Sequence, residues 1–218
     1  MEVKPPESQR RPTLRQEQAN LTRARIRDAA RGLFVRDGYA ATTLKAIAAE
    51  AGVAVQTVYA VFGSKSAILT ELRWMVVDLP EADAARQEAM RAAAAEERLS
   101  RFAYSIRLRW EAAGDIVQVN EDAARTDPAI AAEVRPAEER RQAGIRAFAR
   151  AIVDDFDLPL DAARVAAMVD ALTMYHLYAQ LVRVHRWTPD EYQSWLRGQL
   201  VAAVHPGDPD SPEDGRQP

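Results

Sequence analysis

Residues 42–65 are the segment that most constrains the fold, because their pattern predicts two short helices joined by a tight turn. Four apolar positions at helical spacing give the first helix one buried face: Leu44, Ile47, Ala48 and Ala51. Gly52 follows, where the end of a helix often needs a left-handed backbone that glycine adopts without steric penalty. A second helix is predicted from about Val55 to Phe62. Two helices joined in this way form the helix-turn-helix, whose second helix enters the major groove of DNA.

The flanking residues complete this pattern. Thr43 is a predicted cap of the first helix, and Ser64 is a predicted cap of a further helix that continues to Met75. On the second helix, the residues expected to face inward are Val58, Val61 and Phe62. The residues expected to face outward are Gln56, Thr57 and Tyr59.

The stretch closely resembles the N-terminal domain of the tetracycline-repressor (TetR) family of bacterial transcriptional regulators. The residues that carry the resemblance are 26–34, 37–39, Thr42, Thr43, Ile47, Ala48, 51–53, 57–59, Phe62, Ser64, Lys65, Ile68 and Leu69. Beyond residue 75 the likeness rests on size and helical layout alone.

The composition argues against several other classes. The chain has no cysteine, which excludes a disulfide framework and a thiolate zinc site. No run of about 18 uncharged apolar residues occurs and the N-terminus has no apolar signal core, so we expect a cytoplasmic protein that does not span a membrane. The three histidines lack metal-ligand spacing, and there is no glycine-rich phosphate loop and no G-x-S-x-G motif. We therefore expect no cofactor, no metal and no enzymatic activity.

Charge is divided unevenly along the chain. Residues 1–70 hold 11 Lys and Arg against 6 Asp and Glu, a net charge of +5, whereas the whole chain carries −3. A basic N-terminal domain on an acidic remainder suits a DNA-binding protein with a separate sensing domain, because phosphate neutralisation supplies most non-specific affinity. An uneven division by chance is the alternative.

The periodicity predicts an all-α protein: an N-terminal three-helix helix-turn-helix domain and a C-terminal helical bundle. The predicted parts are a flexible arginine-containing arm (1–19), the DNA-binding domain (20–66), a connecting helix (67–80), a ligand-binding and dimerisation domain (81–204) and a disordered tail (205–218). The first helix is expected from about Leu21 to Asp37.

In the C-terminal part, Gly114 is predicted to end one helix and Pro136 to interrupt another. A single long helix is expected from about residue 161 to 185, and a last helix from 189 to 204. These last two helices are expected to pair with their copies in a dimer.

The start of the second short helix is predicted to reach base edges. Gln56 can bond an adenine bidentately, and its alternative is a solvated face. The resemblance implies phosphate contacts for Tyr59, Lys65 and Thr43; packing between helices is the alternative for Tyr59. The full set predicted to contact DNA is Thr43, Lys45, Gln56, Thr57, Tyr59, Lys65, Arg23 and Arg25. Arginines of the arm, Arg10, Arg11 and Arg15, are candidates for the minor groove.

Four positions depart from the family pattern. Ala54 stands where a serine often caps the second short helix, a cap that contributes about 1 kcal/mol. Ala46 stands where an acidic residue often completes a capping box. Ala60 and Val61 replace polar or aromatic residues, so the recognition helix is less polar than usual.

The resemblance also implies a small-molecule pocket in the C-terminal part. Apolar side chains with a few polar groups are expected around it: Phe102, Ile106, Trp110, Phe148, Ile152, Met168, Leu172, Tyr175 and His176. The alternative is that these residues form an ordinary helical core.

The resemblance implies a homodimeric regulator that binds a double-stranded, pseudo-palindromic operator. Repression that a small apolar or amphipathic effector relieves is the expected mechanism. Two alternatives stay open: a ligand-blind regulator controlled by a protein partner, and an α-helical enzyme or binding protein with a relic DNA-binding domain.

Overall fold

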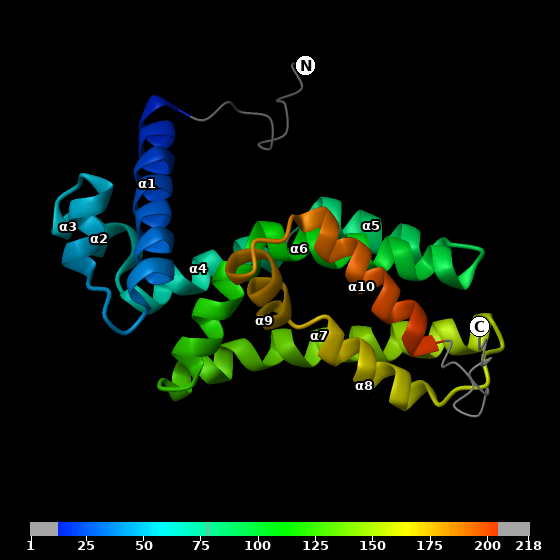
Figure 1. The fold of residues 1–218 in the computed structure, drawn as a ribbon. Coiled ribbons are helices and arrows are strands. Elements are labelled where there is room, and N and C mark those ends of the chain that lie inside the picture. The colour runs from blue at the N-terminus through cyan, green and yellow to red at the C-terminus, as the bar shows by residue number, and fades with distance from the viewer. Residues whose placement is uncertain (1–12, 78, 205–218) are drawn as a thin grey trace, which may run out of the picture. The chain divides into compact units, whose positions relative to one another are not determined.

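The computed structural model describes residues 13–77 and 79–204, which form helices joined by short loops (Figure 1). The chain divides into two compact units, Met1–Leu72 and Arg73–Pro218, and the boundary between them lies inside helix α4. The predicted all-α fold, with an N-terminal helix-turn-helix and a C-terminal helical domain, is confirmed.

The first unit is built around the predicted helix-turn-helix. Its helices are α1 (Leu14–Asp37), α2 (Leu44–Ala51), α3 (Val55–Phe62) and the start of α4 (Lys65–Val77). They bury one apolar core, to which each helix contributes: Ile26, Leu33, Phe34, Ile47, Val58, Ile68 and Leu69. The predicted bounds of α3 are confirmed, and α2 contains the four apolar positions predicted for it.

The start of α1 differs from the prediction. The helix begins at Leu14 rather than near Leu21, so Arg15 lies in its first turn and not in a flexible arm. A capping box holds this end: the Gln16 side chain accepts from the backbone N–H of Thr13 at 2.8 Å, and Thr13 Oγ1 accepts from the Gln16 N–H at 3.3 Å. The first turns are exposed, so apolar periodicity gave no sign of them. Arg10 and Arg11 lie outside the described residues.

The second unit packs long helices around an aromatic core. Its elements are the end of α4, α5 (Pro80–Arg91), α6 (Ala95–Ala124), α7 (Pro128–Asp155), α8 (Ala162–Leu172), α9 (Tyr175–Tyr178), the π-helical segment η2 (Ala179–Val184) and α10 (Pro189–Val204). Phe102 and Phe148 stack at 3.9 Å between centroids, and Tyr178 meets Tyr192 edge-on at 4.9 Å. These ring pairs connect α6 with α7 and α9 with α10.

Two predicted helix breaks are wrong. Helix α6 continues through Gly114, which is glycine for a different reason: a β-carbon there would stand 2.0 Å from Cε2 of Tyr175. Helix α7 continues through Pro136. Proline removes one backbone donor, but Pro136 is exposed, so water can reach the carbonyl that loses its partner.

The predicted long helix from 161 to 185 is also wrong as a single element. Helix α8 ends at Leu172, and the hydroxyl of Thr173 donates to the carbonyl of Val169 at 2.7 Å. Met174 is extended, and the chain then restarts as α9 and passes into the π-helical segment. Neither glycine nor proline marks this break in the sequence.

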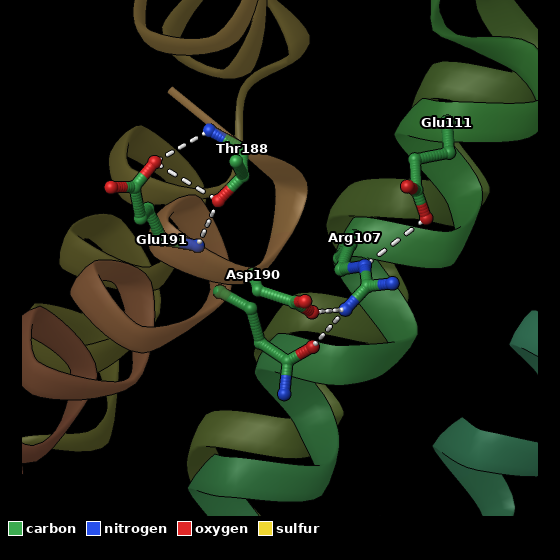
Figure 2. Close-up of polar contacts among 6 residues, drawn as sticks. Arg107, Glu111, Thr188, Asp190 and Glu191 are labelled. Atoms are coloured by element: carbon green, nitrogen blue, oxygen red, sulfur yellow. Dashed lines mark hydrogen bonds and ion pairs between the residues drawn. The ribbon is translucent and has the colours of Figure 1, made fainter.

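Helix α10 is capped by Thr188 and is also held from α6 (Figure 2). The Thr188 backbone N–H donates to the Glu191 carboxylate at 2.7 Å, and the Glu191 N–H donates to Thr188 Oγ1 at 3.2 Å. Arg107 of α6 pairs with Asp190 and donates to Gln193 Oε1 at 3.1 Å. These contacts fix the start of α10 on the second unit.

Within the described ranges, no single helix is both long and apolar enough to cross a membrane; α2 and α3 meet that measure only as a pair, which is bent by 106°. The predicted disordered tail lies outside the described residues.

Candidate nucleic-acid interface and ligand pocket

The turn between α2 and α3 is shaped by caps that the sequence predicts. Thr43 Oγ1 accepts from the Ala46 N–H at 3.1 Å and so caps α2. Gly52 has the left-handed backbone expected of it, with φ 63° and ψ 41°, and the Val53 N–H returns to the carbonyl of Ala48 at 3.0 Å. The two helices are bent by 106° relative to each other. This geometry presents α3 on the surface of the unit.

The outward face of α3 carries polar side chains that the solvent reaches. Gln56 is exposed, Thr57 is half-buried, and Tyr59 keeps 56% of its surface. The Tyr59 hydroxyl has no hydrogen-bond partner among the described residues, so the alternative of a packed Tyr59 is not what the structure shows. Ala54 gives α3 no side-chain cap, which leaves N–H groups at its start open to an acceptor. Thr43 and Lys45 are also exposed.

Lys65 has partners inside the protein. Its ammonium donates to the carbonyls of Tyr39 at 2.7 Å and Thr42 at 2.8 Å, and it lies 4.3 Å from the centre of the Tyr39 ring. Burial lowers the pKa of this ammonium. Lys65 thus holds the loop between α1 and α2, and its phosphate contact stays a prediction.

Arg23 and Arg25 are likewise engaged. Arg23 pairs with Glu71, donates to the carbonyl of Val61 at 3.2 Å, and lies over the ring of Phe62 at 4.4 Å. Arg25 donates to the carbonyl of Ala51 at 2.6 Å, at the end of α2. Both arginines fix the helix-turn-helix to its neighbours.

The residues predicted to surround a ligand are dispersed through the second unit. Most of them pack in the aromatic core: Phe102, Trp110, Phe148, Ile152 and Tyr175 are buried, and Ile106 and Leu172 are partly buried. Met168 and His176 are exposed. Trp110 alone of this set lines the pocket between α6 and α7, and ligand contact by the others stays a prediction.

This pocket has a volume of about 270 Å³ and lies among α6, α7, Arg73 of α4 and Arg86 of α5. Its apolar wall is formed by Trp110, Ala113, Val117, Val134 and Ala137. Its polar lining is formed by Arg73, Arg86, Arg109, Asn120, Glu121, Glu138, Arg140 and Arg141. The sequence did not point to the polar set, because these residues come from separate helices and show no shared motif. In the described part of the chain, no group of three or more His, Cys, Asp or Glu residues is placed to hold a metal.

These features define a helix-turn-helix protein with a second all-α unit that contains a small pocket. The family model described as "Bacterial regulatory proteins, tetR family" matches residues 26–72. The resemblance to the TetR family predicted from the sequence is confirmed by this match over residues 26–72.

Solved structures share the fold across most of the chain. The TetR family transcriptional regulator PfmR from Thermus thermophilus superposes with a TM-score of 0.64 at 22% identity, covering 83% of this chain and 97% of that chain. The regulator FadR from Bacillus subtilis, in complex with stearoyl-CoA, gives 0.63 at 16% identity, covering 84% and 99%. FadR from Bacillus halodurans, a fatty acid degradation regulator, gives 0.65 at 15% identity, covering 84% and 94%. A comparison with curated protein sequences finds no match.

Proposed function

We propose that the protein is a homodimeric repressor that binds a pseudo-palindromic operator and leaves it when a small molecule occupies the second unit. The observation that carries the proposal is the exposed face of α3. Gln56 and Tyr59 stand free at the surface of a capped helix-turn-helix. A glutamine there can read an adenine edge, while Tyr59, Thr43 and Lys45 contact phosphates on either side.

The other residues predicted to contact DNA act mainly by holding α3 in its orientation. Lys65, Arg23 and Arg25 hold the loop and helix ends that orient α3, since their donors already have carbonyl or carboxylate partners. A contact between any of them and phosphate would come in addition to these bonds. Thr57 is half-buried, so its role is part packing within the unit and part contact with DNA.

Dimerisation is proposed through α8, η2 and α10. Three large apolar side chains are exposed along this part of the chain: Met168 at 37%, Met174 at 51% and Val184 at 60%. Exposed apolar side chains can mark an interface between subunits. A twofold dimer would place two α3 helices about 34–36 Å apart, one turn of DNA.

The pocket of the second unit supplies the proposed link to a ligand. Helix α4 carries residues of both units, and its Arg73 both lines the pocket and pairs with Glu133 of α7 at 2.8 Å. A ligand shifts the protein toward whichever state it binds more tightly. FadR from Bacillus subtilis was solved with stearoyl-CoA, which supports a ligand role for this fold.

A genomic DNA selection with the full chain tests the proposal. We expect one pseudo-palindrome, bound by a dimer with salt-dependent affinity. Gln56→Ala is expected to relax preference at one position of each half-site. Gln87→Ala, an exposed glutamine of α5, is the matched control and should leave that preference unchanged. Binding without any preferred sequence would overturn the operator proposal.

A further inference from the structure

The pocket between α6 and α7 is lined by five arginines, and two of them have no carboxylate partner among the described residues. Three of its arginines have carboxylate partners: Arg73 with Glu133 at 2.8 Å, Arg109 with Asp83 at 2.6 Å, and Arg141 with Asp170 at 2.6 Å. Arg86 and Arg140 form no hydrogen bond or ion pair with any described residue. Two guanidinium groups of the lining are therefore available to a ligand.

Arg86 is the more informative of these two. It is half-buried, and removal from water and the nearby charge of Arg109 lower its pKa. Its guanidinium lies against Gly144 of α7, where a β-carbon would stand 2.4 Å from Nη2. Holding an unpaired charge away from water costs free energy, and an anion bound beside it would remove that cost.

Two buried polar atoms that lack a partner in the described part of the chain belong to residues that line the same pocket. They are Nε1 of Trp110, a donor, and Oδ1 of Asn120, an acceptor, on side chains of residues only 4% and 3% exposed. Buried polar groups in folded proteins nearly always have a partner. The Trp110 donor therefore points to a ligand that supplies an acceptor.

The pocket is elongated along α6. Trp110 and Asn120 are ten residues apart in one helix, which corresponds to roughly 15 Å along its axis. The small apolar side chains Ala113 and Val117 lie between them on the lining. Glu121 follows Asn120, so its charge lies toward the far end from Trp110.

We propose that this pocket binds a short-chain amphiphile with an anionic head, either carboxylate or phosphate, seated on Arg86 and the indole N–H of Trp110. The chain of the ligand lies along Ala113 and Val117 toward Asn120, and Arg140 adds positive charge. The pocket volume is near the lower end of the range for ligand sites, which favours a short chain. This inference rests on the proposed function, because it names the ligand class of the same regulator.

Calorimetric binding to the full chain, without DNA, tests the proposal. The probes are octanoate, octyl phosphate, octan-1-ol and octyltrimethylammonium, which share a chain and differ in the charge of the head. We expect the two anions to bind at least about tenfold more tightly than the alcohol, and the cation not to bind. The tighter of the two anions distinguishes carboxylate from phosphate.

Arg86→Gln is expected to weaken the better anion about tenfold or more and to leave the alcohol unchanged. Arg91→Gln, an exposed arginine of the same helix, is the matched control and should bind like the original chain. Arg140→Gln, at an exposed position that cannot disturb the core, provides a second test and should weaken the anions with the fold intact. Equal binding of anion and alcohol, no binding of any probe, or an unchanged affinity in both pocket variants would overturn the proposal.

A separate titration of the operator complex with the better anion tests the proposed function. Anion binding without release of DNA would support the pocket assignment and refute ligand-released repression. Release of DNA by the alcohol but not by the anions would refute the pocket assignment alone.

Discussion

Lys65→Met separates a role in holding the DNA-binding unit together from a role in contacting DNA. In the structure the ammonium donates to the carbonyls of Tyr39 at 2.7 Å and Thr42 at 2.8 Å, with a longer approach of 3.4 Å to the carbonyl of Ala40. Hydrogen bonds from a charged donor contribute about 1.5–3 kcal/mol each. Burial lowers the pKa of Lys65, so desolvation offsets part of this gain. The lower end of the range applies, and we expect a loss of about 2–3 kcal/mol for the two short bonds.

A loss of this size is readily measured by thermal unfolding followed by circular dichroism. For a unit of this length, 1 kcal/mol corresponds to roughly 4–8 °C, so the unfolding transition of the first unit should fall by about 10–20 °C. Lys45→Met is the matched control, because Lys45 is exposed and has no partner among the described residues. Its effect on stability should stay within about 0.5 kcal/mol.

DNA binding by the same variants completes the test. The slope of log affinity against log salt falls by about 0.9 for each phosphate that the protein ceases to neutralise, so Lys45→Met should lower it by about 2 in a dimer. Lys65→Met should weaken binding with little change in slope when measured below its unfolding transition. An unchanged melting temperature together with a lowered slope for Lys65→Met would refute the role as a loop anchor.

Three further substitutions test other parts of the structure. Tyr59→Phe removes one exposed hydroxyl, and we expect weaker binding to all DNA sequences, by about tenfold or more, at unchanged melting temperature; an altered sequence preference in the titrations would contradict this. Gly114→Ala places a β-carbon against Tyr175 and should cost about 1–3 kcal/mol in denaturant unfolding, so a neutral result would show that Tyr175 can move. Gly32→Ala, in the exposed interior of α1 with nothing within 4 Å, should instead raise stability by about 0.5–1 kcal/mol in the same assay, and a loss would indicate a contact that the structure does not show.

The ends of α2 were predictable because the groups that fix them are close in sequence. Thr43 caps a helix three residues before the amide that it accepts from, and Gly52 supplies the left-handed backbone that ends the same helix. Such signals act within one turn of chain, so they remain readable without knowledge of the rest of the fold. The capping box of Thr13 and Gln16 was of the same kind, but it stood ahead of exposed residues with no apolar pattern.

Positions in the second unit show what tertiary packing decided. Glycine is a poor helix former, yet Gly114 lies inside α6. Tyr175, which is distant in sequence, fills the space that a side chain at position 114 would occupy. The break after Leu172 has no glycine or proline, and its carbonyls are satisfied in part by the Thr173 hydroxyl.

The sequence by itself determined α2 and α3, with the Thr43 and Gly52 caps of α2 and the outward face of α3, because those features depend on local backbone chemistry and helical periodicity. Only the tertiary structure decided the second unit, where helix continuity depends on which side chains meet across the core. It also decided the pocket, since Arg86, Trp110 and Arg140 come from three different helices and no spacing in the sequence relates them. Lys65 combines both cases: its position followed from the family pattern, but its carbonyl partners were set by the folded loop between α1 and α2.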